Sequence, residues 1–299
     1  MLTYREKSRG GLECTVDLSA LYPSRSELVQ FQERYRKFRR CDKSTEALYR
    51  LRGGKLTYES EQVIPSKTNK KPPLLLIFGN PASHSVTAGC FFAYKDGSEN
   101  RFWKNLLWEA GVMRFGSAHG LSEEEQNSTR TKEVLSLEYE SPFRIGLCVY
   151  ISMPSPAGGP WSGVAGIRKL IGSKPLKQLE AFETERILKL AERFLTNGGI
   201  AVTFQRNAWE GIRSDDDPTY SIGKAREASL RGSLKGTPKI PLLGVPPTRL
   251  IGPARDVLRQ LLSREGYMLL SETSQHRSCR GCKSKVKPQQ EGRESEPLR

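Results

Sequence analysis

The sequence lacks any long apolar run. No stretch of its 299 residues approaches the ~20 apolar residues that a membrane-spanning helix needs. The first residues also lack the hydrophobic segment that is typical of a signal peptide. We therefore expect a soluble intracellular protein with no membrane partner, acting in the cytoplasm or nucleoid of a prokaryote or in the nucleus of a eukaryote.

Cysteine is scarce and scattered. Six cysteines are spread over the whole chain, which does not resemble a disulfide framework and favours reduced thiols. Cys279 and Cys282 form a lone CxxC pair, and only His276 lies nearby in the sequence. Zinc sites usually need four ligands. The sequence therefore predicts no metal site, and we expect no other cofactor.

Motifs for nucleotide binding are also missing, since the chain has neither a GxGxxG nor a P-loop pattern. Positive charge, in contrast, is abundant. The chain holds 48 Lys and Arg against 33 Asp and Glu, a formal net charge of +15. Such an excess suits a protein that binds a polyanion, although it also fits a membrane surface or simple solubility.

The central feature is a short apolar segment that ends abruptly. Residues 74–78 read Leu-Leu-Leu-Ile-Phe and are followed directly by Gly79-Asn80-Pro81. An apolar run of this length predicts a buried strand of a parallel sheet. Ligands bind beyond the carboxyl ends of such strands, which is where Asn80 is expected. The alternative is a loop asparagine that only caps a turn.

Apolar runs and helical spacings alternate along the rest of the chain. We expect strands at 74–78, 143–151, 200–204 and 240–245, and helices at 24–40, 100–110, 179–195 and 254–265. Ser24 or Ser26 is the expected cap of the first helix. This order predicts an α/β protein, a three-layer sandwich around a central, mainly parallel four-stranded sheet.

The expected organisation has three parts. Residues 1–70 form a basic, partly helical extension, residues 71–270 form the α/β domain, and residues 271–299 form a disordered basic tail. Within the domain, 117–131 reads as surface loop and short helix. The charged, aperiodic stretch 213–238 reads as a long surface excursion or a mobile insertion.

Several short segments follow the central strand in a specific order. They are Gly79-Asn80-Pro81, Ser83-His84-Ser85, Thr87-Ala88-Gly89, Phe91-Phe92-Ala93 and Asn100-Arg101-Phe102-Trp103-Lys104. In this order and spacing the chain resembles the uracil-DNA glycosylase superfamily, nearest its mismatch-specific uracil/thymine-DNA glycosylase branch. The resemblance covers roughly residues 71 to 268. It implies the α/β fold of that superfamily.

The resemblance also implies an activity. It is that of a monofunctional DNA N-glycosylase, which flips a deaminated or mismatched base out of DNA and hydrolyses its N-glycosidic bond. The base would be uracil, or thymine or hypoxanthine. The partner would be duplex DNA with a lesion or mismatch, or single-stranded DNA, and we expect the chain to act as a monomer.

The resemblance implies roles for particular residues. Asn80 would position the attacking water, and Phe92 would stack on the flipped base, a contact worth about 1–3 kcal/mol. The other residues expected to bind the substrate are Gly79, Pro81, Cys90 and Phe91. Of Phe91 and Phe92, one is expected to belong to the core instead.

A second loop carries the expected DNA contacts. Pro246-Pro247-Thr248-Arg249-Leu250 resembles the family's Asn-Pro-Ser-Gly-Leu loop, which enters the minor groove. Leu250 would be the wedge that fills the gap left by the flipped base. Pro247, Thr248 and Arg249 would contact the DNA backbone or the opposite base. The alternative is that Leu250 packs into the core.

Two departures from the family keep other functions open. Pro246 stands where the family has Asn or His, and Val149 stands where one branch has Asn. Pro246 has no polar side chain to hold a base, which favours an alternative: a DNA-binding module that has the fold but little or no activity. A third hypothesis is a nucleotide- or nucleoside-processing α/β enzyme, which the positive charge and the missing nucleotide motifs disfavour.

Overall fold

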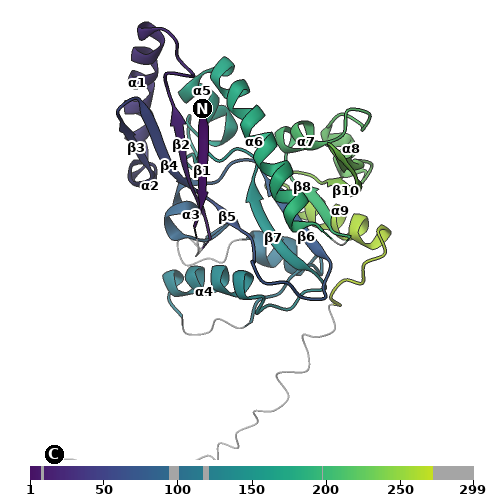
Figure 1. Cartoon of the computed structure of the whole chain (residues 1–299). Helices are drawn as coiled ribbons and strands as arrows, with labels where there is room; N and C mark the ends of the chain where they lie inside the picture. The colour runs from purple at the N-terminus through teal and green to yellow at the C-terminus, as the bar shows by residue number, and fades with distance from the viewer. Residues whose placement is uncertain (8–9, 94–100, 117–120, 197, 272–299) are drawn as a thin grey trace, which may run out of the picture.

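The computed structural model describes residues 1–7, 10–93, 101–116, 121–196 and 198–271 (Figure 1). It is a mixed α/β structure with two sheets, which confirms the expected fold class at that level. None of the helices in this part of the chain has the length and apolar character needed to cross a bilayer. The tail that we predict to be disordered, with Cys279 and Cys282, lies outside the described residues beyond position 271.

The larger sheet has six strands rather than the expected four. Across the sheet they are β5 (Gln62–Val63), β7 (Arg144–Val149), β6 (Pro73–Phe78), β8 (Ile200–Thr203), β10 (Thr237–Gly244) and β9 (Arg231–Leu234). The four inner strands pair in parallel, and the edge strands β5 and β9 pair antiparallel to their neighbours. The sheet is therefore mixed, and the prediction of a four-stranded sheet was wrong because it missed both edges.

Helices cover both faces of this sheet. Alternate side chains of the buried strand β6 point to opposite faces, so that Leu75 and Ile77 belong to one apolar core and Leu74 and Leu76 to the other. The first core contains residues from α5 (Gly163–Ile171), α6 (Ser173–Phe194) and α7 (Arg206–Ile212). The second contains residues from the π-helix η1 (Phe102–Trp108), α4 (Glu123–Ser136) and α9 (Ile251–Arg264).

The N-terminal residues fold into a second sheet, which the sequence reasoning missed. Four antiparallel strands lie in the order β1 (Leu2–Glu6), β2 (Leu12–Asp17), β4 (Lys55–Ser60) and β3 (Tyr49–Arg52). The helices α1 (Arg25–Arg39) and α2 (Lys43–Leu48) connect them (Figure 1). In β2 the side chains alternate strictly between buried and partly exposed, so a period of two was present in the sequence. The predicted domain boundary at residue 70 stays a prediction. Strand β5 lies before this boundary in the sequence but pairs with β7 of the larger sheet.

The expected helices are confirmed in most places. Helix α1 begins after Ser24, whose hydroxyl accepts from the amide of Glu27 while the Glu27 carboxylate accepts from the amide of Ser24. The helix expected at 100–110 is η1, and Gly111 follows it in the left-handed region with φ of 73°. Helices α6 and α9 cover the other two predicted helical segments.

Two segments are more ordered than predicted. For 117–131 we expected surface loop and a short helix, whereas the fourteen-residue helix α4 runs from Glu123 to Ser136. The stretch 213–238 holds α8 (Ile222–Arg226) and the hairpin of β9 with β10. The Asp217 carboxylate organises this stretch by accepting from the amides of Ser214 and Ser233, and the Trp209 indole donates to the carbonyl of Pro218. The two Asp217 bonds lie within the stretch, and the Trp209 bond joins it to α7.

A buried carboxyl beside β5 generates a prediction about pH. Glu61 is only 6% exposed, and its Oε1 atom has no hydrogen-bond partner among the described residues. Burial raises the pKa of this carboxyl well above its ordinary value. Above about pH 4.3 the unfolded state releases this proton, while the folded state keeps it until the raised pKa is reached. Between these two pKa values the free energy of unfolding therefore falls as pH rises.

The variant Glu61→Gln should remove this pH dependence. Its melting temperature should match that of the native chain at low pH and exceed it by several degrees at pH 8, at roughly 2–4 °C per kcal/mol. Thermal denaturation at several pH values measures the difference. Glu59→Gln, at a half-exposed ion pair with Lys7, is the control and should change little. Parallel pH curves for the native chain and Glu61→Gln would contradict the assignment.

Candidate functional site

The loops that follow the four parallel strands meet at one edge of the larger sheet. They begin at Gly79 after β6, Tyr150 after β7, Phe204 after β8 and Val245 after β10. Backbone hydrogen bonds continue the sheet beyond its strands, since Tyr150 donates to Phe78, Phe204 to Ile77 and Val245 to Thr203. Carboxyl ends of parallel strands are where α/β proteins bind ligands. This edge is therefore the candidate site.

The Asn80 side chain is held there through its amide nitrogen. Nδ2 donates to the Ser155 hydroxyl at 2.9 Å, the Met153 carbonyl at 3.3 Å and the Pro81 carbonyl at 3.4 Å. Carbonyl oxygens only accept, so the nitrogen of the amide must face them. Within the described part of the chain no donor reaches Oδ1 of this partly exposed side chain. The oxygen is thus left to accept from water or from a substrate.

The loops after β6 and β7 are joined by their backbones. The Ile151 amide donates to the Gly79 carbonyl at 2.8 Å, and the Ser155 amide donates to the Pro81 carbonyl at 3.0 Å. The Ser83 amide returns a bond to the Ser155 carbonyl at 2.8 Å. Pro81 is buried, so it shapes the loop and does not face the open site. This ladder fixes Ser155, which in turn fixes Asn80.

The need for glycine at position 79 comes from Gln205, a residue that was not predicted to be near the site. A Cβ atom on this buried glycine would lie only 2.6 Å from the carboxamide carbon of Gln205. The Gln205 side chain therefore packs directly over the Gly79 backbone, beside Asn80. Gln205 is partly exposed and comes two residues after β8 ends. A search for polar residues after each parallel strand would have found it.

The three residues at positions 90–92 have different environments. Phe91 and Cys90 are each 2% exposed and belong to the core, so Phe91 is the core member of the phenylalanine pair. Burial raises the pKa of the Cys90 thiol to about 12, which keeps it protonated at neutral pH. Phe92 alone is partly exposed. Of the three, only Phe92 is placed to contact a ligand.

Phe92 is held in an unusual conformation. Its φ of 49° lies in the left-handed region, which for a bulky residue costs about 1–3 kcal/mol. The Trp103 indole donates to the carbonyls of Phe91 and Phe92 at 2.9 and 3.1 Å. The Phe92 ring stacks on Phe102, with centroids 3.9 Å apart, and meets the edge of Phe78 at 5.2 Å. The fold therefore stores strain to present this ring next to the β6 loop.

The loop after β10 has one fully exposed member. Pro246 is buried, Pro247 and Thr248 are partly exposed, and Arg249 is exposed. Leu250 is also partly exposed, and its amide donates to the Pro247 carbonyl at 2.8 Å in the turn that precedes α9. Leu250 is thus outside the fully buried core, and its role as a wedge stays a prediction. Arg249 lies close enough to Tyr220 to oppose the rise that burial causes in the Tyr220 pKa.

A fully buried ion pair in α6 fixes the loop that follows β7. Glu183 and Arg186 of α6 are 1% and 2% exposed and are joined at 2.8 Å. The Glu183 carboxylate also accepts from the amide and hydroxyl of Ser152, and Arg186 donates to the carbonyl of Val149 at 2.6 Å. Tyr58 of the N-terminal sheet bonds to the Ser152 hydroxyl at 2.8 Å. This network fixes the start of the loop that carries Ser155.

Among the described residues, no acid or base bonds to the Asn80 side chain. The described hydrogen-bond partners of Asn80 are carbonyl and hydroxyl oxygens. In the part of the chain that the structure describes, no group of three or more His, Cys, Asp or Glu side chains is placed to hold a metal ion. A neutral amide, a second amide at Gln205 and an aromatic ring can orient water and stack on a planar group.

No protein-family model matches the chain, and a search of curated proteins found no match either. The resemblance to the uracil-DNA glycosylases thus stays a prediction drawn from the ordered segments 79–104.

The buried network generates a prediction about stability. Glu183→Gln leaves the Arg186 charge buried without its counter-ion, which should lower the free energy of unfolding by about 3–5 kcal/mol. Urea denaturation of the purified chain measures this loss. Glu185→Gln is the matched control on the same helix, because the Glu185–Lys189 pair is exposed and worth less than about 1 kcal/mol. Equal, small losses in both variants would show that the network does not support the fold.

Proposed function

We propose that the chain is a monofunctional DNA N-glycosylase that acts as a monomer on DNA carrying uracil or another deaminated or mismatched base. The observation that carries the proposal is the Asn80 amide, whose nitrogen is anchored while its oxygen is left to hold a water. The parallel order β7-β6-β8-β10 supports the three-layer, glycosylase-like fold that belongs to the same proposal. Its place of action would be wherever the cell keeps its DNA, the nucleoid or the nucleus.

In the proposed reaction a water bound to Oδ1 of Asn80 attacks C1′ of the deoxyribose. The bond between C1′ and the base nitrogen breaks, and its electron pair leaves with the base. The proton that the water loses passes to the departing base or to solvent water. A neutral amide is too weak a base to take a full proton, so the acceleration must come from positioning. We therefore expect slow turnover. Phe92 would stack on the flipped base, and strain in its backbone would keep the ring in place before the base arrives.

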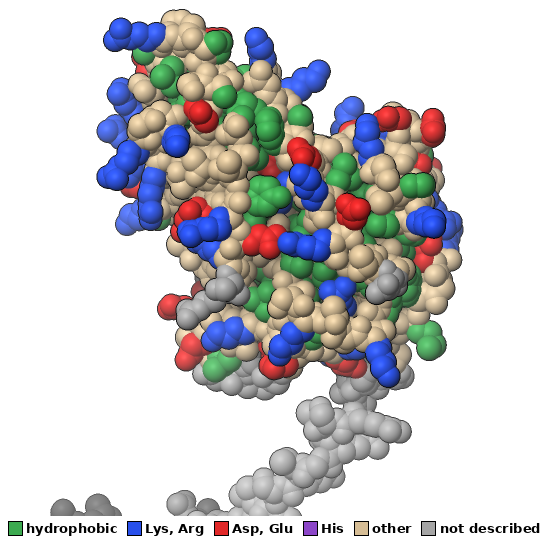
Figure 2. Space-filling view, viewed as in Figure 1, with side chains coloured by type: hydrophobic (Ala, Val, Ile, Leu, Met, Phe, Trp, Pro, Cys, Tyr) green, Lys and Arg blue, Asp and Glu red, His purple; other side chains and the backbone are tan. Residues whose placement is uncertain are grey.

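The charge distribution supports DNA as the partner. Residues 25–55 hold ten Lys and Arg against four Asp and Glu. In Figure 2, Lys and Arg side chains gather along the outer side of the part that holds α1 and β3. Exposed basic residues on α1 include Arg36, Lys37 and Arg39. Helix α2 joins this surface to the site, since Thr45 donates to the hydroxyl of Ser83 at 2.8 Å.

A second candidate function is a DNA-binding module with little or no catalytic activity. Pro246 favours it, because this buried residue supplies no polar group toward a base at the end of β10. Val149 is 1% exposed within the core and supplies none either. The two candidates differ only in excision, so one assay separates them.

The test uses end-labelled duplexes with uracil, thymine, hypoxanthine or xanthine opposite guanine, followed by alkali to cut abasic sites. We expect excision of at least one base. Asn80→Ala should slow single-turnover excision at least ~100-fold, since losing the orientation of a reactant costs that much. Duplex affinity and melting temperature should stay near native values. Gln260→Ala, which removes an exposed amide from α9, is the control.

Other outcomes are equally informative. Excision by Asn80→Ala at the native rate would contradict the role of this residue. Tight, salt-dependent duplex binding without any excision would favour the inactive binding module, because each phosphate contact releases condensed counterions. Binding that does not change between low and physiological salt would count against DNA as the partner.

A further inference from the structure

A cavity of about 560 Å³ lies where the two sheets meet, and its volume is within the range of small-molecule sites. One wall comes from residues at the ends of β1 and β4 and from β5. The other comes from α3 (Ser83–Ala88) and the residues that follow it. Neither Asn80 nor Phe92 lines this cavity, so it is distinct from the candidate site.

The cavity is lined by a buried carboxyl, that of Glu61 between β4 and β5. Glu61 is 6% exposed, and its Oε1 atom is enclosed without a hydrogen-bond partner. The other oxygen, Oε2, is not enclosed in this way, and no described residue donates to it. Burial and, next, the Glu61 carboxyl raise the pKa of the Cys90 thiol on the wall after α3. The carboxyl therefore faces across the cavity, and Oε2 is the oxygen that a ligand can reach.

The charges around this carboxyl do not compensate it. Lys7 and Glu59 also line the cavity, but they pair with each other at 2.9 Å. Arg130 of α4 lies beyond Cys90 and opposes the rise in the pKa of that thiol. Burial raises the pKa of Glu61 well above its ordinary value, and no described charge opposes that rise. Among the described lining residues, Glu61 is thus the acid without a counter-ion.

Apolar side chains line the cavity together with the carboxyl. Val63 and Phe91 belong to one apolar core and Val86 to the other, and all three are buried. A ligand that fits both features has a positively charged end and an apolar body.

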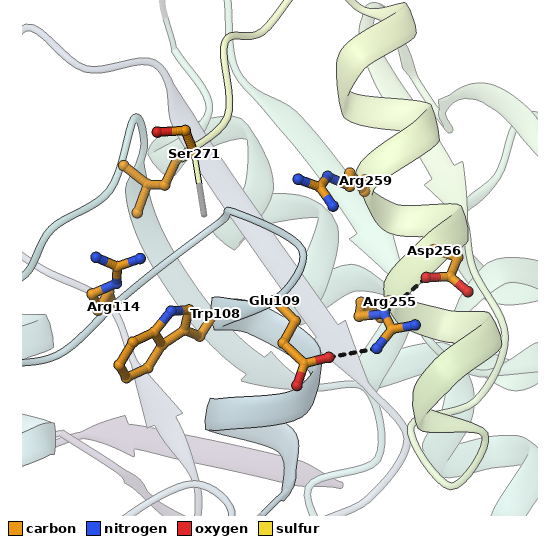
Figure 3. A pocket seen from close by; sticks show the side chains of 8 residues that line it. Trp108, Glu109, Arg114, Arg255, Asp256, Arg259 and Ser271 are labelled. Carbon is orange, nitrogen blue, oxygen red and sulfur yellow. Dashed lines mark hydrogen bonds and ion pairs between the residues drawn. The ribbon is translucent and has the colours of Figure 1, made fainter. Parts of the chain in front are cut away.

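The cavity between η1 and α9 differs in its charges (Figure 3). It has a volume of about 420 Å³, and Arg255 in its wall bonds to both Glu109 and Asp256. Arg114 on the facing side pairs with Glu140. These acids and arginines are matched within the fold, so they do not indicate a charged ligand as Glu61 does.

We propose that the cavity beside Glu61 binds a small organic cation, an ammonium group on an apolar body. The ammonium would donate to Oε2, and the body would lie against Val63, Val86 and Phe91. A buried carboxylate is unfavourable unless it is paired, so the cation replaces the proton that Glu61 otherwise holds. That proton passes to solvent water, and the ammonium keeps its own protons. The site does not depend on the proposed base excision.

The test is calorimetric titration of the full chain with butylammonium chloride at constant ionic strength. We expect saturable binding with release of a proton, which is measured by repeating the titration in a buffer of different ionisation enthalpy. Glu61→Gln should release no proton and should bind at least about tenfold more weakly, since a charge-assisted hydrogen bond contributes roughly that factor. This variant should fold, because a neutral side chain of the same shape suits the buried position. Glu13→Gln, which removes a partly exposed carboxylate of β2 outside the cavity, is the matched control.

Butan-1-ol, which has a similar size and no charge, separates the effect of the ammonium from that of the apolar body. It should bind at least about ten times more weakly than butylammonium. Equal binding of the two molecules would overturn the proposal, because the apolar wall alone would then hold the ligand. Absence of saturable binding, or equal affinities of the native chain and Glu61→Gln, would overturn it as well. Binding that Glu61→Gln weakens and Glu13→Gln leaves unchanged supports the site, whether or not the chain excises a base.

Discussion

The buried ion pair between Glu183 and Arg186 is the constraint on which the site depends. Two charges removed from water are costly unless each is paired and hydrogen-bonded. Here each has additional partners. Ser152, Val149 and Tyr150 lie at the end of β7, and the Gln62 side chain belongs to the neighbouring edge strand β5. Helix α6 therefore cannot shift along the sheet without breaking these bonds. The loop from Ser152 to Ser155 is fixed as a consequence, and with it the acceptors that hold Asn80.

The N-terminal sheet completes this support. Its strands place the hydroxyls of Tyr58 and Tyr49 against Ser152 and the carbonyl of Pro154. Phe38 of α1 packs on Trp161 at the far end of the same loop, with centroids 5.7 Å apart. The residues before position 61 thus form one wall of the β7 loop. Their second role in our account, a basic outer surface for DNA, uses the opposite face of the same elements.

Much of this arrangement follows from the sequence, and the exceptions have physical reasons. Strands β6 and β7 are buried on both faces, so their apolar runs identified them directly. The N-terminal strands have one polar face, and their short alternating pattern was hidden among charged residues. Asn80 and Phe92 were proposed as site residues because they lie in one ordered segment, and their roles stay predictions. Gln205 was missed because its contact with Gly79 joins residues more than a hundred positions apart.

The Glu183–Arg186 pair shows a further limit of the sequence. Two charges three residues apart on a helix normally indicate a solvated face, and here they are the most buried polar groups of α6. Likewise, the stretch 213–238 is aperiodic, because it is organised by individual hydrogen bonds of Asp217 and Trp209 and not by a repeating apolar face. Tertiary contacts of this kind leave no periodic signal.

In the proposed reaction Ser155 and Asn80 act as one unit, in which the hydroxyl orients the amide and the amide holds the water. A double-mutant cycle in single-turnover excision tests this coupling, with Asn80→Ala, Ser155→Ala and the double variant on the best duplex substrate. We expect strong non-additivity: Ser155→Ala slows excision by itself and adds almost nothing once Asn80 is absent. Losses that multiply, so that the double variant is slower than Asn80→Ala by the full factor of Ser155→Ala, would contradict it.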